Sequence, residues 1–66
     1  MSDEYAWPRR HTAEVNGRST RFRSYWKFGT FGLHSDAVQA LKDAGIYERP
    51  VDWERVKIDG HPHTYY

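Results

Sequence analysis

Two stretches of alternating apolar and polar residues, at positions 5–15 and 18–28, meet at the dipeptide Asn16-Gly17. Side chains on a strand alternate between two faces, so this alternation predicts two strands. An Asn-Gly pair between such segments is a strong hairpin signal, because a type I′ turn needs positive φ at both positions. We therefore predict a two-residue hairpin in which Val15 faces Arg18.

This register gathers aromatic side chains on one face of the hairpin. The expected pairs on that face are His11 with Phe22, Trp7 with Trp26, and Tyr5 with Phe28. Arg9 falls on the same face, opposite Ser24, which leaves two alternatives. Either its side chain extends along the apolar surface, or a β-bulge near Arg9-Arg10 shifts the register.

A helical spacing of apolar residues follows and predicts a helix from Ser35 to Ala44. Ser35 suits the N-cap, and Gly45 suits the position after the helix, where φ is often positive. Pro50 prevents any further extension. The stripe that would pack on the sheet consists of Ala37, Val38, Leu41 and Ala44.

A second turn signal, Asp59-Gly60, lies near the end of the sequence. It predicts a strand that begins before Val56 and a short partner strand after the turn. The expected pairs are Ile58 with His61, Val56 with His63, and Glu54 with Tyr65. A tail without strand structure after residue 60 is the alternative.

These elements predict the α+β class: one domain over residues 1–66, with a small antiparallel sheet and one helix on its aromatic face. The order is strand, strand, helix, strand, with a fourth short strand left open. The chain is short of Leu, Ile and Val but has three Trp, five Tyr and three Phe, so we expect aromatics to fill the core. The expected core residues are Trp7, Phe22, Trp26, Phe28, Val56 and Ile58, against Val38 and Leu41.

Composition narrows the classes of function. The chain has no cysteine, which excludes disulfide scaffolds and cysteine-ligated zinc sites. It has no apolar run long enough for a membrane helix, so we expect a cytoplasmic protein with no membrane partner. No catalytic or cofactor motif is present, and we expect a non-enzymatic binding module without a cofactor.

The net charge of +1 hides an uneven distribution, with basic residues in excess over residues 1–33 and acidic residues in excess over residues 34–66. The face of the first hairpin away from the helix is expected to carry Arg10, Arg21, Arg23, Tyr25 and Lys27. Guanidinium groups neutralise phosphates and an exposed ring stacks on a base, so this face predicts nucleic-acid binding. An acidic protein surface is the alternative partner, and an ordinary water-exposed sheet face is the simplest reading.

Three further features are open. Trp53 and Tyr66, beside Arg55, form an interface if they are exposed, whereas a bulge before Val56 would turn Trp53 inward. The sequence predicts no metal site. His61 and His63 are candidate ligands because alternate strand residues share a face, and a third ligand would have to come from His11, His34, Asp59 or Glu54. An exposed edge strand would permit a homodimer.

The size of the chain and its strand, strand, helix, strand order resemble small phage proteins that bind and inhibit host enzymes. The resemblance is one of layout, without a shared motif. It implies a phage protein of the host-takeover type, an inhibitor or adaptor that would use the basic face and an exposed strand edge.

Overall fold

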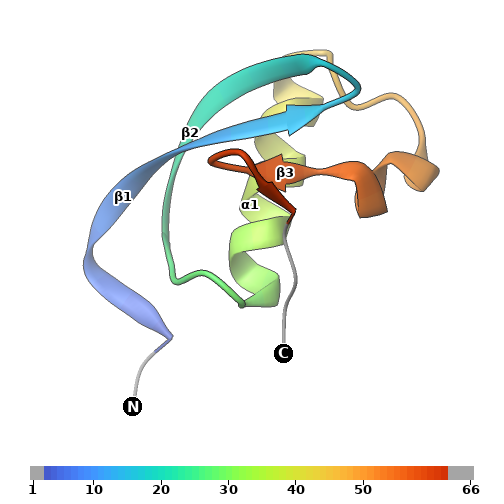
Figure 1. The fold of residues 1–66 in the computed structure, drawn as a ribbon. Coiled ribbons are helices and arrows are strands. Elements are labelled where there is room, and N and C mark those ends of the chain that lie inside the picture. The colour runs from blue at the N-terminus through green and yellow to red at the C-terminus, as the bar shows by residue number, and fades with distance from the viewer. Residues whose placement is uncertain (1–2, 63–66) are drawn as a thin grey trace.

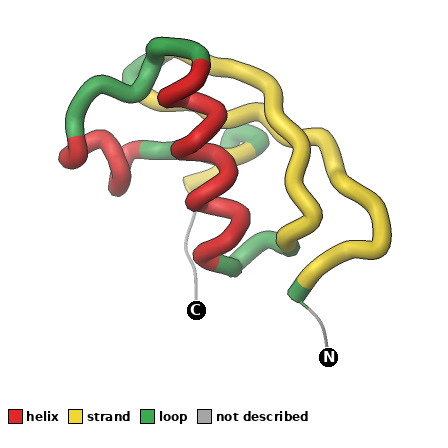
Figure 2. Tube along the Cα trace, turned by 180° about the vertical axis from the view of Figure 1, so that it is seen from behind, coloured by secondary structure: helices red, strands yellow, loops and turns green. Residues whose placement is uncertain are grey.

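A computed structural model of the chain describes residues 3–62. The elements, in chain order, are β1 (Glu4–Val15), β2 (Arg18–Trp26), α1 (Phe31–Asp43), the 3₁₀-helix η1 (Pro50–Arg55), β3 (Lys57–Ile58) and β4 (His61–Pro62). The strands form one antiparallel sheet in the order β2-β1-β3-β4 (Figure 1). The helix α1 lies against one face of the long β1-β2 hairpin (Figure 2). The predicted α+β class is confirmed, and the fourth short strand is present.

The first hairpin has the predicted turn and, over most of its length, the predicted register. Asn16 and Gly17 have φ of 53° and 79°, as a type I′ turn requires. All pairs from Val15 with Arg18 to Arg9 with Ser24 follow the expected register.

Beyond Arg9 the expected register is wrong, because Glu4 and not Trp7 pairs with Trp26. The register shift lies between Glu4 and Arg9, on the N-terminal side of the expected place at Arg9-Arg10, and Arg9 keeps Ser24 as its partner. Two contacts give the physical reason for the shift. The ring of Trp26 lies so close to α1 that a Cβ at Gly32 would be 2.4 Å from it, and the Arg9 guanidinium lies 4.4 Å from the centroid of the Tyr5 ring.

The helix begins one turn earlier than predicted. Thr30, and not Ser35, is the N-cap, and its hydroxyl accepts a hydrogen bond from the Leu33 N–H at 3.2 Å. The predicted C-terminal end is correct, because Gly45 follows the helix with φ of 72°. Its N–H donates to Lys42 O and the Ile46 N–H donates to Leu41 O, the two bonds of a Schellman motif.

The predicted third strand is largely wrong, because residues 50–55 form η1 and only Lys57–Ile58 pair with β1. Asp52 accounts for the difference: its carboxylate accepts hydrogen bonds from the Arg49 N–H and the Asn16 amide. These bonds hold residues 49–52 in a capped turn instead of an extended strand. The predicted pairs Ile58 with His61 and Lys57 with Pro62 are confirmed, whereas the pairs that involve His63 and Tyr65 lie outside the described residues.

The core is aliphatic, which corrects the expectation that aromatics fill it. Its buried members are Ala13, Val15, Leu33, Ala37, Val38, Leu41, Ile46, Val56 and Ile58. Four aromatics, namely Phe22, Trp26, Tyr47 and Trp53, are partly buried around it. Trp7 and Phe28, both expected inside, are 78% and 48% exposed. No helix of the described part of the chain is long and apolar enough to cross a membrane.

Candidate nucleic-acid interface

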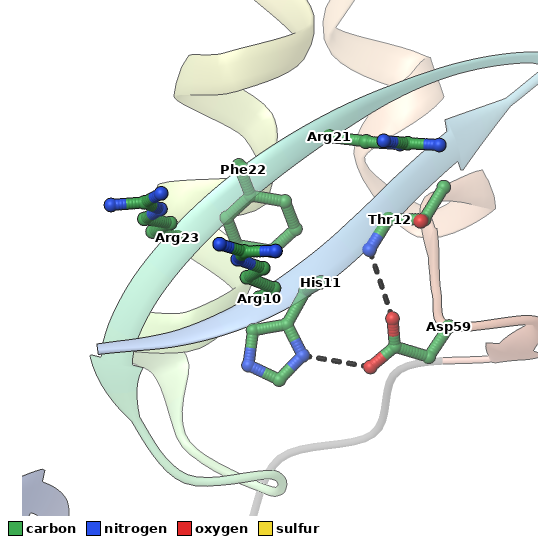
Figure 3. Close-up of a pocket in the computed structure, with 7 residues that line it drawn as sticks. All are labelled: Arg10, His11, Thr12, Arg21, Phe22, Arg23 and Asp59. Atoms are coloured by element: carbon green, nitrogen blue, oxygen red, sulfur yellow. Dashed lines mark hydrogen bonds and ion pairs between the residues drawn. The ribbon is translucent and has the colours of Figure 1, made fainter. Parts of the chain in front are cut away.

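Three of the five predicted site residues line a hollow of about 430 Å³ on the β1-β2 hairpin. Arg10 comes from β1, and Arg21 and Arg23 come from β2 (Figure 3). All three side chains are exposed, and they alternate along the strands with residues that turn toward α1 and the core. The hollow is completed by His11, Thr12, Phe22 and Asp59.

The three arginines are neighbours on the hairpin, and none of them is ion-paired to Asp59, the acidic residue that lines the same hollow. Arg10 and Arg23 are directly opposite partners across the hairpin. Arg21 precedes Arg23 by two residues on β2 and so lies on the same face. Within residues 3–62, the ion pair that the structure forms joins His11 to Asp59 and involves none of these arginines. Like charges at directly opposite positions destabilise a strand pair. This arrangement therefore lowers the stability of the hairpin unless an anion binds there.

Tyr25 lies within β2, whereas Lys27 lies just after its last residue. Tyr25 continues the row of Arg21 and Arg23 on β2, and its side chain is 50% exposed. Lys27 lies beyond the end of β2, where its ammonium is 5.5 Å from the centroid of the Tyr5 ring. Arg21, Arg23 and Tyr25 thus form one row on β2, Arg10 lies opposite Arg23 on β1, and Lys27 lies beyond the end of the strand beside Tyr5.

Arg9 is a basic residue that the sequence analysis did not assign to the site. It is exposed and lies over the Tyr5 ring, which Lys27 also approaches. The signal in the sequence was its poor fit opposite Ser24 on the face of the hairpin that turns toward α1. Arg9 keeps Ser24 as its partner, but its guanidinium lies over the Tyr5 ring and adds a second cation beside Lys27.

Asp59 fixes the edge of the hollow. Its carboxylate accepts hydrogen bonds from the Thr12 N–H at 2.9 Å and from the His11 ring, whose Nδ1 is 2.7 Å away (Figure 3). Its own N–H donates to Thr12 O at 2.8 Å. Burial acts to raise the pKa of Asp59, but the bonds from His11 and Thr12 outweigh it and hold the pKa below its usual value. An ionised Asp59 thus orients the buried His11 and holds the turn before β4 against β1.

The other candidate residues do not join this hollow. Trp53 is half-buried and stacks on His34, with the ring centroids 4.3 Å apart, so the inward alternative is correct. Arg55 is exposed at the end of η1, and Tyr66 lies outside the described residues. His61 is exposed on β4, His63 is not described, and residues 3–62 contain no group of three side chains suited to a metal ion.

The chain was compared with known protein families, proteins and structures, and its function is inferred from the geometry of the site. No protein-family model matches the chain, and searches of curated proteins and of solved structures found no match either.

Proposed function

We propose that this protein is a non-enzymatic module that binds nucleic acid through the β1-β2 hairpin. Arg10, Arg21 and Arg23 contact phosphates, and Tyr25 stacks on a base. The observation that carries the proposal is the directly opposed pair of Arg10 and Arg23, with Arg21 beside it and no acidic partner among residues 3–62.

The chemistry of these side chains suits a polyanion. A guanidinium group donates two parallel hydrogen bonds to phosphate oxygens, and charge-assisted bonds of this kind are about twice as strong as neutral ones. Alternate residues on a strand are about 6.6–6.8 Å apart, so Arg21, Arg23 and Tyr25 present three evenly spaced contacts. A polymer with regularly spaced charges and exposed rings matches this row.

The test is fluorescence anisotropy with labelled oligonucleotides at several salt concentrations. Three phosphate contacts predict a log-log slope of about −2 to −3 for affinity against salt. Each of Arg10→Gln, Arg21→Gln and Arg23→Gln should weaken binding and lower the slope by about 0.7–0.9. Lys42→Gln removes the same charge from the exposed face of α1 and is the matched control. Absence of binding at low salt, or equal loss in the control, would overturn the proposal.

The second candidate partner is an acidic protein surface, as an inhibitor or adaptor of the phage host-takeover type would require. It is favoured by the topology, because β2 lies at an edge of the sheet with its arginines beside a free strand edge. Affinity purification from a cell lysate with and without nuclease separates the two candidates. A partner protein retained after nuclease treatment supports this second candidate, whereas loss of all bound material supports the first. A cytoplasmic location follows from either candidate and is part of the proposal.

A further inference from the structure

The bulge in β1 has an unusual composition and position. Between the pairs Glu4 with Trp26 and Arg9 with Ser24, β1 contains residues 5–8, whereas β2 contains Tyr25 alone. Four residues therefore stand opposite one. Bulges of this kind redirect side chains and interrupt pairing, and they are common next to functional sites.

The redirected side chain is Trp7. In a regular hairpin it would turn toward the core, but here it is 78% exposed, the highest value among the large hydrophobic residues described. Its place in the bulge puts it at the level of Tyr25, one step along the hairpin from the pair of Arg10 and Arg23. The bulge and the strand opposite it thus each carry an exposed aromatic residue, Trp7 and Tyr25.

Further cations lie around this aromatic pair. Arg9 follows the bulge directly and, with Lys27, lies over the ring of Tyr5 within the bulge. Both positive charges therefore lie against Tyr5, which belongs to the same bulge as Trp7. Over their whole length, β1 and β2 carry five arginines and two glutamates.

On this basis we propose that Trp7 is a second base-stacking residue and that the hairpin binds single-stranded nucleic acid in preference to a duplex. The inference rests on the proposed function and adds the class of ligand. A duplex offers phosphates but hides the faces of its bases, whereas a single strand offers both. A ligand with free aromatic faces can stack on both exposed rings, Trp7 in the bulge and Tyr25 opposite it.

The positive charge decides between a nucleic-acid strand and a protein partner for these rings. Exposed Trp, Tyr and Arg are also frequent at the centres of protein interfaces. Such centres are depleted of charged residues overall. Here Arg10 and Arg23 are the adjacent pair on the same hairpin, and Arg9 and Lys27 lie over Tyr5 in the bulge. The density of cations favours a phosphate backbone.

The experiment compares labelled oligothymidylate with the same strand annealed to oligodeoxyadenylate, by fluorescence anisotropy. Trp7→Ala should weaken binding of the single strand by about 5- to 150-fold, the loss expected for one stacked base, with little effect on the duplex. Trp7→Phe should retain most of the affinity because it keeps an aromatic face. Phe31→Ala removes an exposed ring that contacts Trp53 instead, and is the control. Circular dichroism checks that each variant is folded.

The outcomes separate this inference from the proposed function. If the duplex binds as tightly as the single strand, or Trp7→Ala leaves binding unchanged while Arg10→Gln and Arg23→Gln weaken it, the inference is wrong and the proposed function stands. If neither nucleic acid binds, both fail together. If the Trp7→Ala variant instead loses a co-purified protein and binds oligothymidylate normally, the rings belong to a protein interface and the inference is overturned.

Discussion

The carboxylate of Asp59 joins two parts of the chain that are 48 residues apart in sequence, through His11, and binds the neighbouring Thr12 N–H as well. Asp59 also has a φ of 54°, a left-handed conformation that Asp and Asn tolerate better than other side chains. One residue therefore serves both the turn before β4 and the attachment of that turn to β1. The ionised form makes these bonds, which is why its pKa lies below the ordinary value of 3.8.

Asp59 gives stability a dependence on acid pH. A carboxyl with a depressed folded-state pKa stabilises the protein above its unfolded pKa, and this contribution is lost as the pH falls through the folded value. Asp59→Asn keeps the shape and tolerates the positive φ, so it isolates the charge. We expect it to lower the free energy of unfolding by about 1 kcal/mol at neutral pH and to reduce the further loss below about pH 4.

Chemical denaturation across the acid range measures this effect. Some acid sensitivity should remain in Asp59→Asn, because the hydrogen bond from Asn16 also holds the pKa of Asp52 below its ordinary value, against the effect of burial. Asp43→Asn removes an exposed carboxylate from α1 and serves as the control. An Asp59→Asn variant with the acid profile of the wild type would show that the bonds to His11 and Thr12 do not stabilise the fold.

At the level of elements, the start of α1 shows how two plausible caps compete. Ser35 and Thr30 both have a hydroxyl that can cap a helix. Thr30 has an additional bond, since its hydroxyl donates to Lys27 O at 2.7 Å while it accepts from Leu33 N–H. The earlier start buries Leu33 and His34 against the rest of the molecule, and this gain decides the outcome.

The two hydroxyl residues can be distinguished by substitution. Thr30→Ala should lower the free energy of unfolding by about 1 kcal/mol, the usual value of an N-cap. Ser35→Ala, inside the helix and exposed, should change it by less than about 0.5 kcal/mol. Thermal or urea unfolding followed by circular dichroism provides both numbers. An equal loss for the two variants would argue against Thr30 as the cap.

The elements differ in how far the sequence determines them. Asn16-Gly17, Gly45 and Asp59-Gly60 were predictable because each needs positive φ, a local property of the backbone. The bulge before Arg9 was only one of two alternatives. It depends on the packing of Trp26 against Gly32, and both residues are far from the bulge in the sequence. The 3₁₀-helix was missed for the same reason, since the bond from Asn16 to Asp52 spans 36 residues.

The candidate site divides in the same way. The row of Arg21, Arg23 and Tyr25 follows from strand periodicity alone, and Arg10 follows from the register. The exposure of Trp7 requires the bulge, and alternation along the strand placed that ring in the core. Alternation gave the correct partner for Arg9 but could not show that its guanidinium lies over the Tyr5 ring. The surface around the bulge therefore depends on long-range packing, which strand periodicity does not predict.

At the level of the whole molecule, the same arginines affect association with a second copy of the chain. β2 is an edge strand of the sheet, so a homodimer through β2 is one self-association that the topology allows. Antiparallel pairing centred on Phe22 would place Arg21 of one copy opposite Arg23 of the other. Repulsion between these charges should keep the protein monomeric at low salt.

Salt should therefore act in opposite directions on the two kinds of association. Added salt screens the arginines and should increase the dimer fraction, whereas it should weaken nucleic-acid binding. Sedimentation velocity over a salt series measures the first effect. The double variant Arg21→Gln and Arg23→Gln should dimerise more readily at low salt than the wild type. A dimer that does not respond to salt, or that is lost when salt is added, would exclude pairing through this edge.

The shortness of β3 has a consequence for the order in which the protein forms during synthesis. Ile58 is fully buried in the core, yet β3 contains only Lys57–Ile58 and pairs with Ala13 and Glu14 near the other end of the chain. The hairpin and α1 are built from neighbouring residues and can form as the chain emerges, because synthesis proceeds from the N-terminus. The helix α1 covers the face of the hairpin earlier, but the edge of β1 at Ala13 and Glu14 stays unpaired until residues 57 and 58 have been made. Until then the nascent chain carries an open strand edge that could pair with another chain.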